Sequence, residues 1–185
     1  MVRSSVRQFC LGVSVAGVGL GVLLLSGRVR EQPVVFTVWE AEAARYVPEG
    51  LKVQPGQPCP DFGLATTGGD TVRPSGLRGR RVAVVLLTRG CRYCVELSRD
   101  LGDLRQEGKG GELLVVSVGD TADAREVQRE LLGGIDVCVD PDGLIMAEFG
   151  VSGTPAVLII GADGRLERVG YGLPGSRRAV KSHGV

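Results

Sequence analysis

Apolar residues in this chain fall into two kinds of run, and each kind predicts a different structure. Residues 81–87 (RVAVVLL) and Glu112–Val118 (ELLVVSV) are nearly continuous apolar runs, as expected for strands buried on both faces of a parallel sheet. Between them, residues 92–107 carry apolar positions at a mostly helical spacing and end in glycines. This alternation of strand and helix is typical of an α/β fold.

Shorter stretches predict the remaining elements. Helices are expected at 121–132 and 144–149, and strands at 135–139, 156–160 and 166–171. Upstream, FGLATTGGDTV places a Gly-Gly-Asp turn between two strand candidates. The prediction is an α/β domain with a central mixed β-sheet, flanking helices and an N-terminal β-hairpin extension.

The start of the chain is of a different kind. Residues 9–25 (FCLGVSVAGVGLGVLLL) carry no charge, and a helix of that length reaches about 25 Å, a marginal membrane span. Arg3 and Arg7 precede it, and a poor cleavage site follows. We therefore expect a basic head at 1–8 and one transmembrane anchor or uncleaved signal at 9–26. A buried core helix is the alternative.

Proline content and polarity set the other boundaries. Apolar density falls after the anchor and five prolines follow before residue 61, so residues 27–54 are predicted to be a linker. The folded domain is expected at 55–175. Because PGSRRAVKSHGV is short and polar, residues 176–185 are expected to form a polar C-terminal tail.

Overall charge excludes one class of partner. The 185 residues include 22 Lys and Arg against 21 Asp and Glu, a net charge of +1. Such a balance provides no field that gathers polyanions, so no nucleic acid is expected as a partner. The length suits a single domain with an appendage.

The candidate chemistry lies in LTRGCRYCVEL, where Cys91 and Cys94 follow a predicted strand and open a predicted helix. Helix N-terminal N–H groups, together with Arg89 and Arg92, favour a Cys91 thiolate and lower its pKa below the usual value of about 8.5. Cys91 is then the nucleophile. Cys94, one helical turn on, is the resolving thiol.

The pair has two other interpretations. A metal site needs two more ligands, but Cys10, Cys59 and Cys138 are scattered and the sole histidine, His183, is near the end of the chain. No metal and no cofactor are therefore expected. An inert pair of core cysteines is the other alternative. Cys59 and Cys138 either form a second disulfide or lie buried separately, and separate burial is favoured.

Several segments together resemble a known family. They are PGQPCPDFGLATTGGDTV, VAVVLLTRGCRYCVEL, DVCVDPDG and FGVSGTPAVLIIGADGRL. Over residues 55–172 the sequence resembles the thioredoxin superfamily, especially its membrane-anchored TlpA/ResA-like and MauD-like proteins and the related redoxin (AhpC/TSA-type) domains. The resemblance implies a thioredoxin-like fold with Cys91 as nucleophile and Cys94 as resolving cysteine. It also implies a cis peptide at Thr154–Pro155 that packs against the disulfide and binds extended substrates.

The sequence departs from this family near the cysteines. Arg89 and Gly90 stand where thioredoxins usually carry a tryptophan, closer to the MauD-like pattern. Val85 replaces the buried acid of thioredoxins, and Leu97 replaces the glutamate of ResA-like proteins. No general acid is therefore evident near Cys94.

These observations predict an extracytoplasmic thiol–disulfide oxidoreductase, held in the cell membrane by a single pass. Its partners are protein thiols and disulfides and a membrane electron donor, with a role in maturing a cytochrome or a dehydrogenase. One alternative is a redoxin-type thiol peroxidase with Cys91 as peroxidatic cysteine. Thr88 supplies the Thr-x-x-Cys half of that motif, but Val84 replaces its proline. The other is a non-enzymatic assembly protein or copper carrier, although copper carriers of the Sco type use Cys-x-x-x-Cys and a distant histidine.

Overall fold

The computed structural model describes residues 49–106 and 112–183. The expected membrane anchor at 9–26 and most of the expected linker lie outside these ranges. Among the described residues, no helix combines the length and the apolar character needed to span a bilayer.

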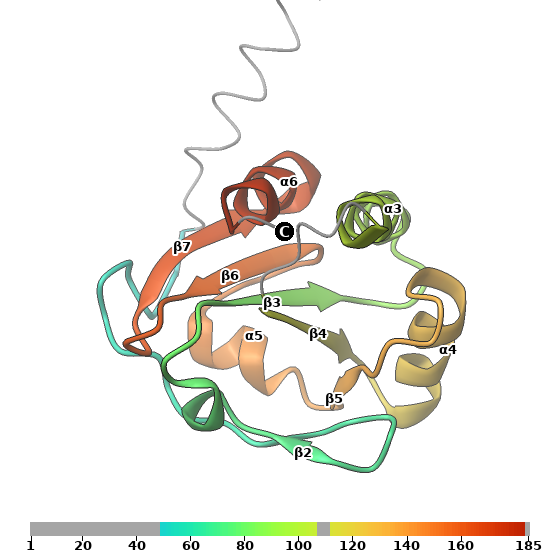
Figure 1. Cartoon of the computed structure of the whole chain (residues 1–185), viewed down its shortest axis with the longest axis horizontal. Coiled ribbons are helices and arrows are strands. Elements are labelled where there is room, and N and C mark those ends of the chain that lie inside the picture. Colours follow the sequence, from blue (N-terminus) through green and yellow to red (C-terminus); the bar gives the residue numbers. More distant parts are fainter. Residues whose placement is uncertain (1–48, 107–111, 184–185) are drawn as a thin grey trace, which may run out of the picture. The chain divides into compact units, whose positions relative to one another are not determined.

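A five-stranded sheet forms the centre of the domain (Figure 1). Its spatial order is β5-β4-β3-β6-β7. The strands are β3 (Val82–Leu87), β4 (Glu112–Val118), β5 (Cys138–Asp140), β6 (Ala156–Ile160) and β7 (Leu166–Tyr171). β3, β4 and β5 run parallel, whereas β6 and β7 pair antiparallel. The expected mixed sheet of an α/β fold is confirmed.

Helices cover both faces of the sheet. One face carries α3 (Arg92–Gln106), α4 (Thr121–Leu131) and α6 (Gly172–His183), and the other carries α5 (Leu144–Phe149) (Figure 1). All six residues of β3 are buried, because successive side chains point to opposite faces and both faces are covered. This explains the unbroken apolar run in the sequence.

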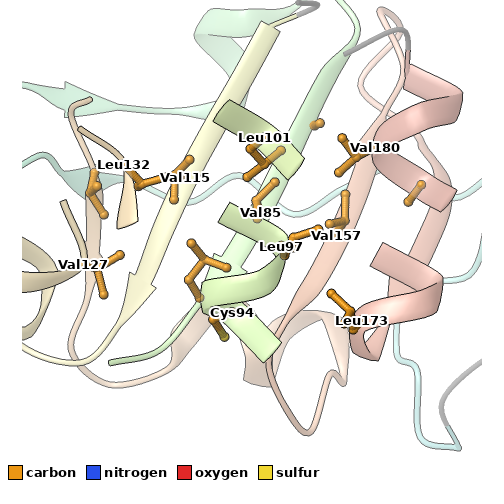
Figure 2. Close-up of a cluster of buried hydrophobic side chains, with 14 of the residues drawn as sticks. Val85, Cys94, Leu97, Leu101, Val115, Val127, Leu132, Val157, Leu173 and Val180 are labelled. Atoms are coloured by element: carbon orange, nitrogen blue, oxygen red, sulfur yellow. The ribbon is translucent and has the colours of Figure 1, made fainter. Parts of the chain in front are cut away.

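The cluster between the sheet and α3, α4 and α6 also holds part of the candidate site. Leu97 and Leu101 of α3 pack against Val85 and Val115 of the sheet (Figure 2). Cys94 belongs to the same cluster and is fully buried. One cysteine of the candidate pair therefore lies inside the main core.

The predicted hairpin is present. β1 (Leu64–Ala65) pairs antiparallel with β2 (Thr71–Val72), and the 3₁₀-helix η1 (Pro74–Leu77) follows. The hairpin loop reaches β5, where Thr66 forms a bridge with Cys138. At the other edge of the sheet, Pro58 forms a bridge with Arg165, the residue before β7.

The domain begins earlier than the sequence indicated. Residues 27–54 were expected to be linker, but Leu51 and Val53 are buried in the core cluster around α5. The Lys52 N–H donates to the Phe149 carbonyl at 3.0 Å. Two apolar side chains inside a polar, proline-rich stretch, together with this hydrogen bond, join the segment to the domain.

The C-terminal end also differs from expectation. Residues 176–185 were predicted to be a polar tail, whereas α6 continues to His183 and packs on β6, β7 and α3. Its buried positions are Leu173, Gly175, Ser176, Ala179, Val180 and His183. Small residues and one histidine make up most of this buried stripe, so the average polarity of the segment concealed it.

His183 is a buried titratable residue at the end of α6. It is only 8% exposed, and its Nε2 lies 3.1 Å from the Glu112 carbonyl oxygen. Burial lowers the pKa of His183 from its ordinary value of 6.5, with the Glu112 carbonyl and Glu167 opposing and Arg81 reinforcing the shift. The unfolded chain therefore takes up the proton more readily than the folded chain.

We expect the free energy of unfolding to fall as the pH drops from about 7 to about 5, because the neutral imidazole stabilises the fold only above the unfolded pKa. His183→Gln should flatten this part of the profile, since His183 is the only histidine. Urea unfolding of both proteins across the range checks the prediction. An equal pH slope in the variant would assign the dependence to other groups.

Candidate active site: a disulfide at the start of α3

The two candidate cysteines are bonded to each other. β3 ends at Leu87, the chain turns through Gly90 with a φ of +72°, and α3 begins at Arg92. Cys91 and Cys94 form a disulfide across this first helical turn, with their Cα atoms 5.2 Å apart. The positive φ at Gly90 suits glycine because it lacks a Cβ.

The two sulfur atoms lie in unequal surroundings. Cys91 is partly exposed, whereas Cys94 is fully buried. The backbone N–H of Cys94 donates to the Cys91 sulfur at 3.2 Å. A helix N-terminal N–H at this distance stabilises negative charge on Cys91 when the disulfide opens. Of the two cysteines, Cys91 is therefore the more accessible.

A second loop lies against the disulfide. The Thr154 carbonyl oxygen is 3.7 Å from the Cys91 sulfur, and the Thr154–Pro155 peptide bond is cis. The Thr154 hydroxyl is hydrogen-bonded to the Thr88 hydroxyl at 2.9 Å. The structure thus brings Thr154 and Pro155, singled out as substrate-binding residues, beside Cys91. Contact with a substrate stays a prediction.

Both arginines near the pair are engaged with carboxylates. Arg89 contacts Asp123 at 3.3 Å and Glu126 at 2.6 Å on α4. The hydrogen bond to Asp123, followed by the charge of Glu126, raises the pKa of Arg89. Arg92 lies 3.8 Å from Glu96, and its side chain is 87% exposed. Each positive charge is shared with an acid, and its influence on the Cys91 pKa stays a prediction.

The surroundings of Cys94 are apolar. Val85 and Leu97, which replace the family's acidic residues, are both fully buried in the cluster that contains Cys94. Nearby Ser98 donates its hydroxyl to the Val95 carbonyl of its own helix at 2.8 Å. None of these groups supplies a carboxylate for proton transfer to Cys94.

The other two described cysteines are free and far apart in the sheet topology. Cys138 pairs with Val116 at the β5 edge, whereas the Cys59 N–H donates to the Gly164 carbonyl in the turn between β6 and β7. The two cysteines are not bonded to each other: Cys138 is buried, as the favoured interpretation predicts, whereas Cys59 is only partly buried. Burial raises the pKa of each thiol to about 11, aided by Asp163 at Cys59 and Asp136 at Cys138.

Metal ligands do not converge in the described part of the chain. No three His, Cys, Asp or Glu side chains within residues 49–106 and 112–183 are arranged to hold an ion.

Two residues that contact the site were missed by the sequence analysis. The Ser176 hydroxyl donates to the Pro155 carbonyl at 3.2 Å, and the Tyr171 hydroxyl lies 3.3 Å from the Ser152 hydroxyl. Ser176 lies in the segment that the sequence predicts to be a polar tail, and Tyr171 is the last residue of β7. No spacing pattern connects either residue to the cysteines.

The fold and the disulfide define a thioredoxin-like redox protein with a dithiol–disulfide couple. A family model describes the particular group within this class. The chain belongs to the AhpC/TSA family, whose model matches residues 55–169.

Solved structures agree with the fold. The chain is similar to a Chlorobium tepidum protein described as the thiol:disulfide interchange protein DsbE, with 23% identity, a TM-score of 0.61, and coverage of 71% of this chain and 96% of that one. It is similar to a Bacteroides thetaiotaomicron protein described as a protein disulfide isomerase, with 19% identity, a TM-score of 0.60, and coverage of 72% and 88%. The exposed lipoprotein thioredoxin Etrx1 of Streptococcus pneumoniae is 23% identical, with a TM-score of 0.55 and coverage of 66% and 99%. No curated protein matches the sequence.

Proposed function

We propose that this chain is a thiol–disulfide oxidoreductase that exchanges disulfides with protein substrates through Cys91 and Cys94. The observation that best supports this proposal is the difference in exposure between the two bonded cysteines. A partly exposed Cys91 accepts a helix N-terminal N–H, and it is bonded to a fully buried Cys94. Such an arrangement gives one attacking sulfur and one resolving sulfur.

The exchange balances without a cofactor. In the reduced chain the Cys91 thiolate attacks a substrate disulfide, forms a mixed disulfide and releases one substrate thiolate. The Cys94 thiolate then attacks the Cys91 sulfur, releases the second substrate thiolate and closes the Cys91–Cys94 disulfide. Two electrons pass to the substrate, and a partner dithiol restores the reduced pair. In the opposite direction the chain oxidises a substrate dithiol.

Substrate docking is assigned to Thr154 and Pro155. The Thr154 carbonyl borders the Cys91 sulfur at 3.7 Å, so a chain lying along this loop presents its own sulfur to Cys91. Arg89 and Arg92 are assigned to tuning the Cys91 pKa, in balance with their carboxylate partners.

We place the domain on the extracytoplasmic side of the cell membrane, anchored by the apolar segment at residues 9–25. A membrane electron donor is then the natural redox partner, and a cytochrome or dehydrogenase under maturation is the natural substrate. An exposed lipoprotein among the structural neighbours supports an outside location.

Replacing Cys94 by serine tests the function. The variant keeps the attacking Cys91 but cannot resolve the mixed disulfide, so covalent adducts with substrate proteins should accumulate. They should appear on non-reducing gels of cells that express the full chain and disappear after treatment with dithiothreitol. The Cys91→Ser, Cys94→Ser double variant is the matched control. Equal adducts from both variants would show that another cysteine makes them and would overturn the proposal.

A thiol peroxidase is the second candidate, because the AhpC/TSA family model matches the domain. Thr88 has the expected spacing from Cys91, but its hydroxyl is hydrogen-bonded to the Thr154 hydroxyl. Val84, at the position of the motif proline, is buried within β3. Peroxide consumption with a thiol donor distinguishes the two functions, since a rate no better than that of free cysteine removes the peroxidase.

A further inference from the structure

Helix α6 reaches the loop beside the disulfide through one buried hydroxyl. Ser176 is fully buried, and its Oγ lies 3.2 Å from the Pro155 carbonyl oxygen and 3.4 Å from the Gly170 carbonyl oxygen. A serine hydroxyl has one proton and donates to one acceptor at a time. The shorter contact, to Pro155, joins α6 to the residue that directly precedes β6.

Close packing of α6 on β7 makes this contact reachable. A Cβ at Gly170 would lie 2.4 Å from the Gly175 carbonyl oxygen and 2.7 Å from the Ala179 Cβ. Only glycine therefore allows the helix backbone to approach the strand at this point. Ser176 follows Gly175 directly. The close packing of α6 on β7 that Gly170 permits therefore also brings the Ser176 hydroxyl to the loop.

The loop is held from its other side as well. Thr88 lies in the segment between β3 and the disulfide, and its hydroxyl is hydrogen-bonded to the Thr154 hydroxyl at 2.9 Å. Tyr171 lies against the loop, with its hydroxyl 2.6 Å from where a Gly153 Cβ would be. Residues 152–155 are thus fixed between the disulfide segment and the β7–α6 segment, and Ser176 supplies the buried hydroxyl on the α6 side.

We propose that Ser176 is a positioning residue that holds the 152–155 loop in place for protein substrates, an inference that rests on the proposed function. Removing its hydroxyl leaves the Pro155 carbonyl without this buried donor, so other loop positions gain population. A protein substrate that docks on the loop loses a pre-organised surface. Dithiothreitol is small, reaches the partly exposed Cys91 without docking, and should not sense the change.

The test compares Ser176→Ala with Ser98→Ala in the full chain. Ser98 is also buried, at 4% exposure, but its hydroxyl donates to a carbonyl of its own helix. Ser98→Ala therefore removes the same buried hydroxyl group without changing a contact to the loop. Two rates are measured for each protein: reduction of its disulfide by dithiothreitol, and reduction of insulin disulfides by the reduced protein.

We expect Ser176→Ala to lower kcat/KM for insulin about 10-fold, mainly through KM, while the dithiothreitol rate changes less than about 2-fold. A normal dithiothreitol rate also shows that the Cys91–Cys94 couple is intact. Ser98→Ala should change neither rate. Equal insulin rates in the two variants, or a parallel loss of both rates in Ser176→Ala, would overturn the positioning role alone. Failure of the unaltered chain to exchange disulfides with insulin or any other protein would instead overturn the proposed function.

Discussion

Cys91→Ser is expected to lower disulfide exchange with a protein substrate by at least about 10³-fold, because a serine hydroxyl cannot replace the attacking thiolate. The remaining Cys94 is fully buried and does not meet the substrate. Relative to the reduced chain, which also lacks the Cys91–Cys94 disulfide, stability should change little, since Cys91 is partly exposed. Insulin reduction, measured on the full chain with a thiol donor, gives the rate.

Cys59→Ser is the matched control for this variant. Cys59 is a free, partly buried cysteine in the turn region far from the disulfide, and its raised pKa of about 11 leaves little thiolate at neutral pH. Its replacement should leave the exchange rate within about 2-fold of the original. Retention of substantial exchange by Cys91→Ser would assign the attack to a different sulfur.

Gly150→Ala is expected to give the largest loss of stability among simple glycine replacements, about 2–5 kcal/mol. Gly150 ends α5 with a φ of +72°, and an added Cβ would lie 2.1 Å from the Gly50 carbonyl oxygen and 2.7 Å from the Lys52 nitrogen. Both neighbours are backbone, so relief requires moving the 49–53 segment. Leu51 and Val53 would then leave the core. Urea unfolding measures the loss.

The contribution of the backbone overlap can be separated from that of the strained conformation. Gly133 also has a positive φ, +58°, but a Cβ there would meet nothing within 4 Å. Gly133→Ala should therefore cost only the strain, about 1 kcal/mol. Equal losses at the two sites would mean that the 49–53 segment does not pack against α5.

Continuous apolar runs made the central strands predictable. β4 lies at Glu112–Val118 as expected, because its residues 115–117 are buried and the strand carries few polar positions. β5 was expected at 135–139 but is only Cys138–Asp140. The residues before it bond to the hairpin loop instead, with the Val137 carbonyl accepting from Thr67 at 2.8 Å.

Contacts between distant segments could not be predicted from local patterns. The sequence predicts that Arg89 lowers the pKa of Cys91. It does not show that the partners of Arg89 are Asp123 and Glu126, which lie more than 30 positions further along the chain on α4. The contact between Ser176 and Pro155 likewise depends on how α6 packs, which Gly170 permits. Local spacing identified the chemical groups of the site, whereas tertiary packing selected their partners.

The loop pairings at the two edges of the sheet have a consequence for how the protein meets other chains. Unpaired edge strands act as templates on which a foreign strand can add, the first step of aggregation. Here Thr66 pairs with part of the β5 edge. At the β7 edge, the Leu166 N–H donates to the Gln57 carbonyl at 2.9 Å. These pairings leave fewer open backbone groups along the two described edges, so a foreign chain has less room to add a strand there.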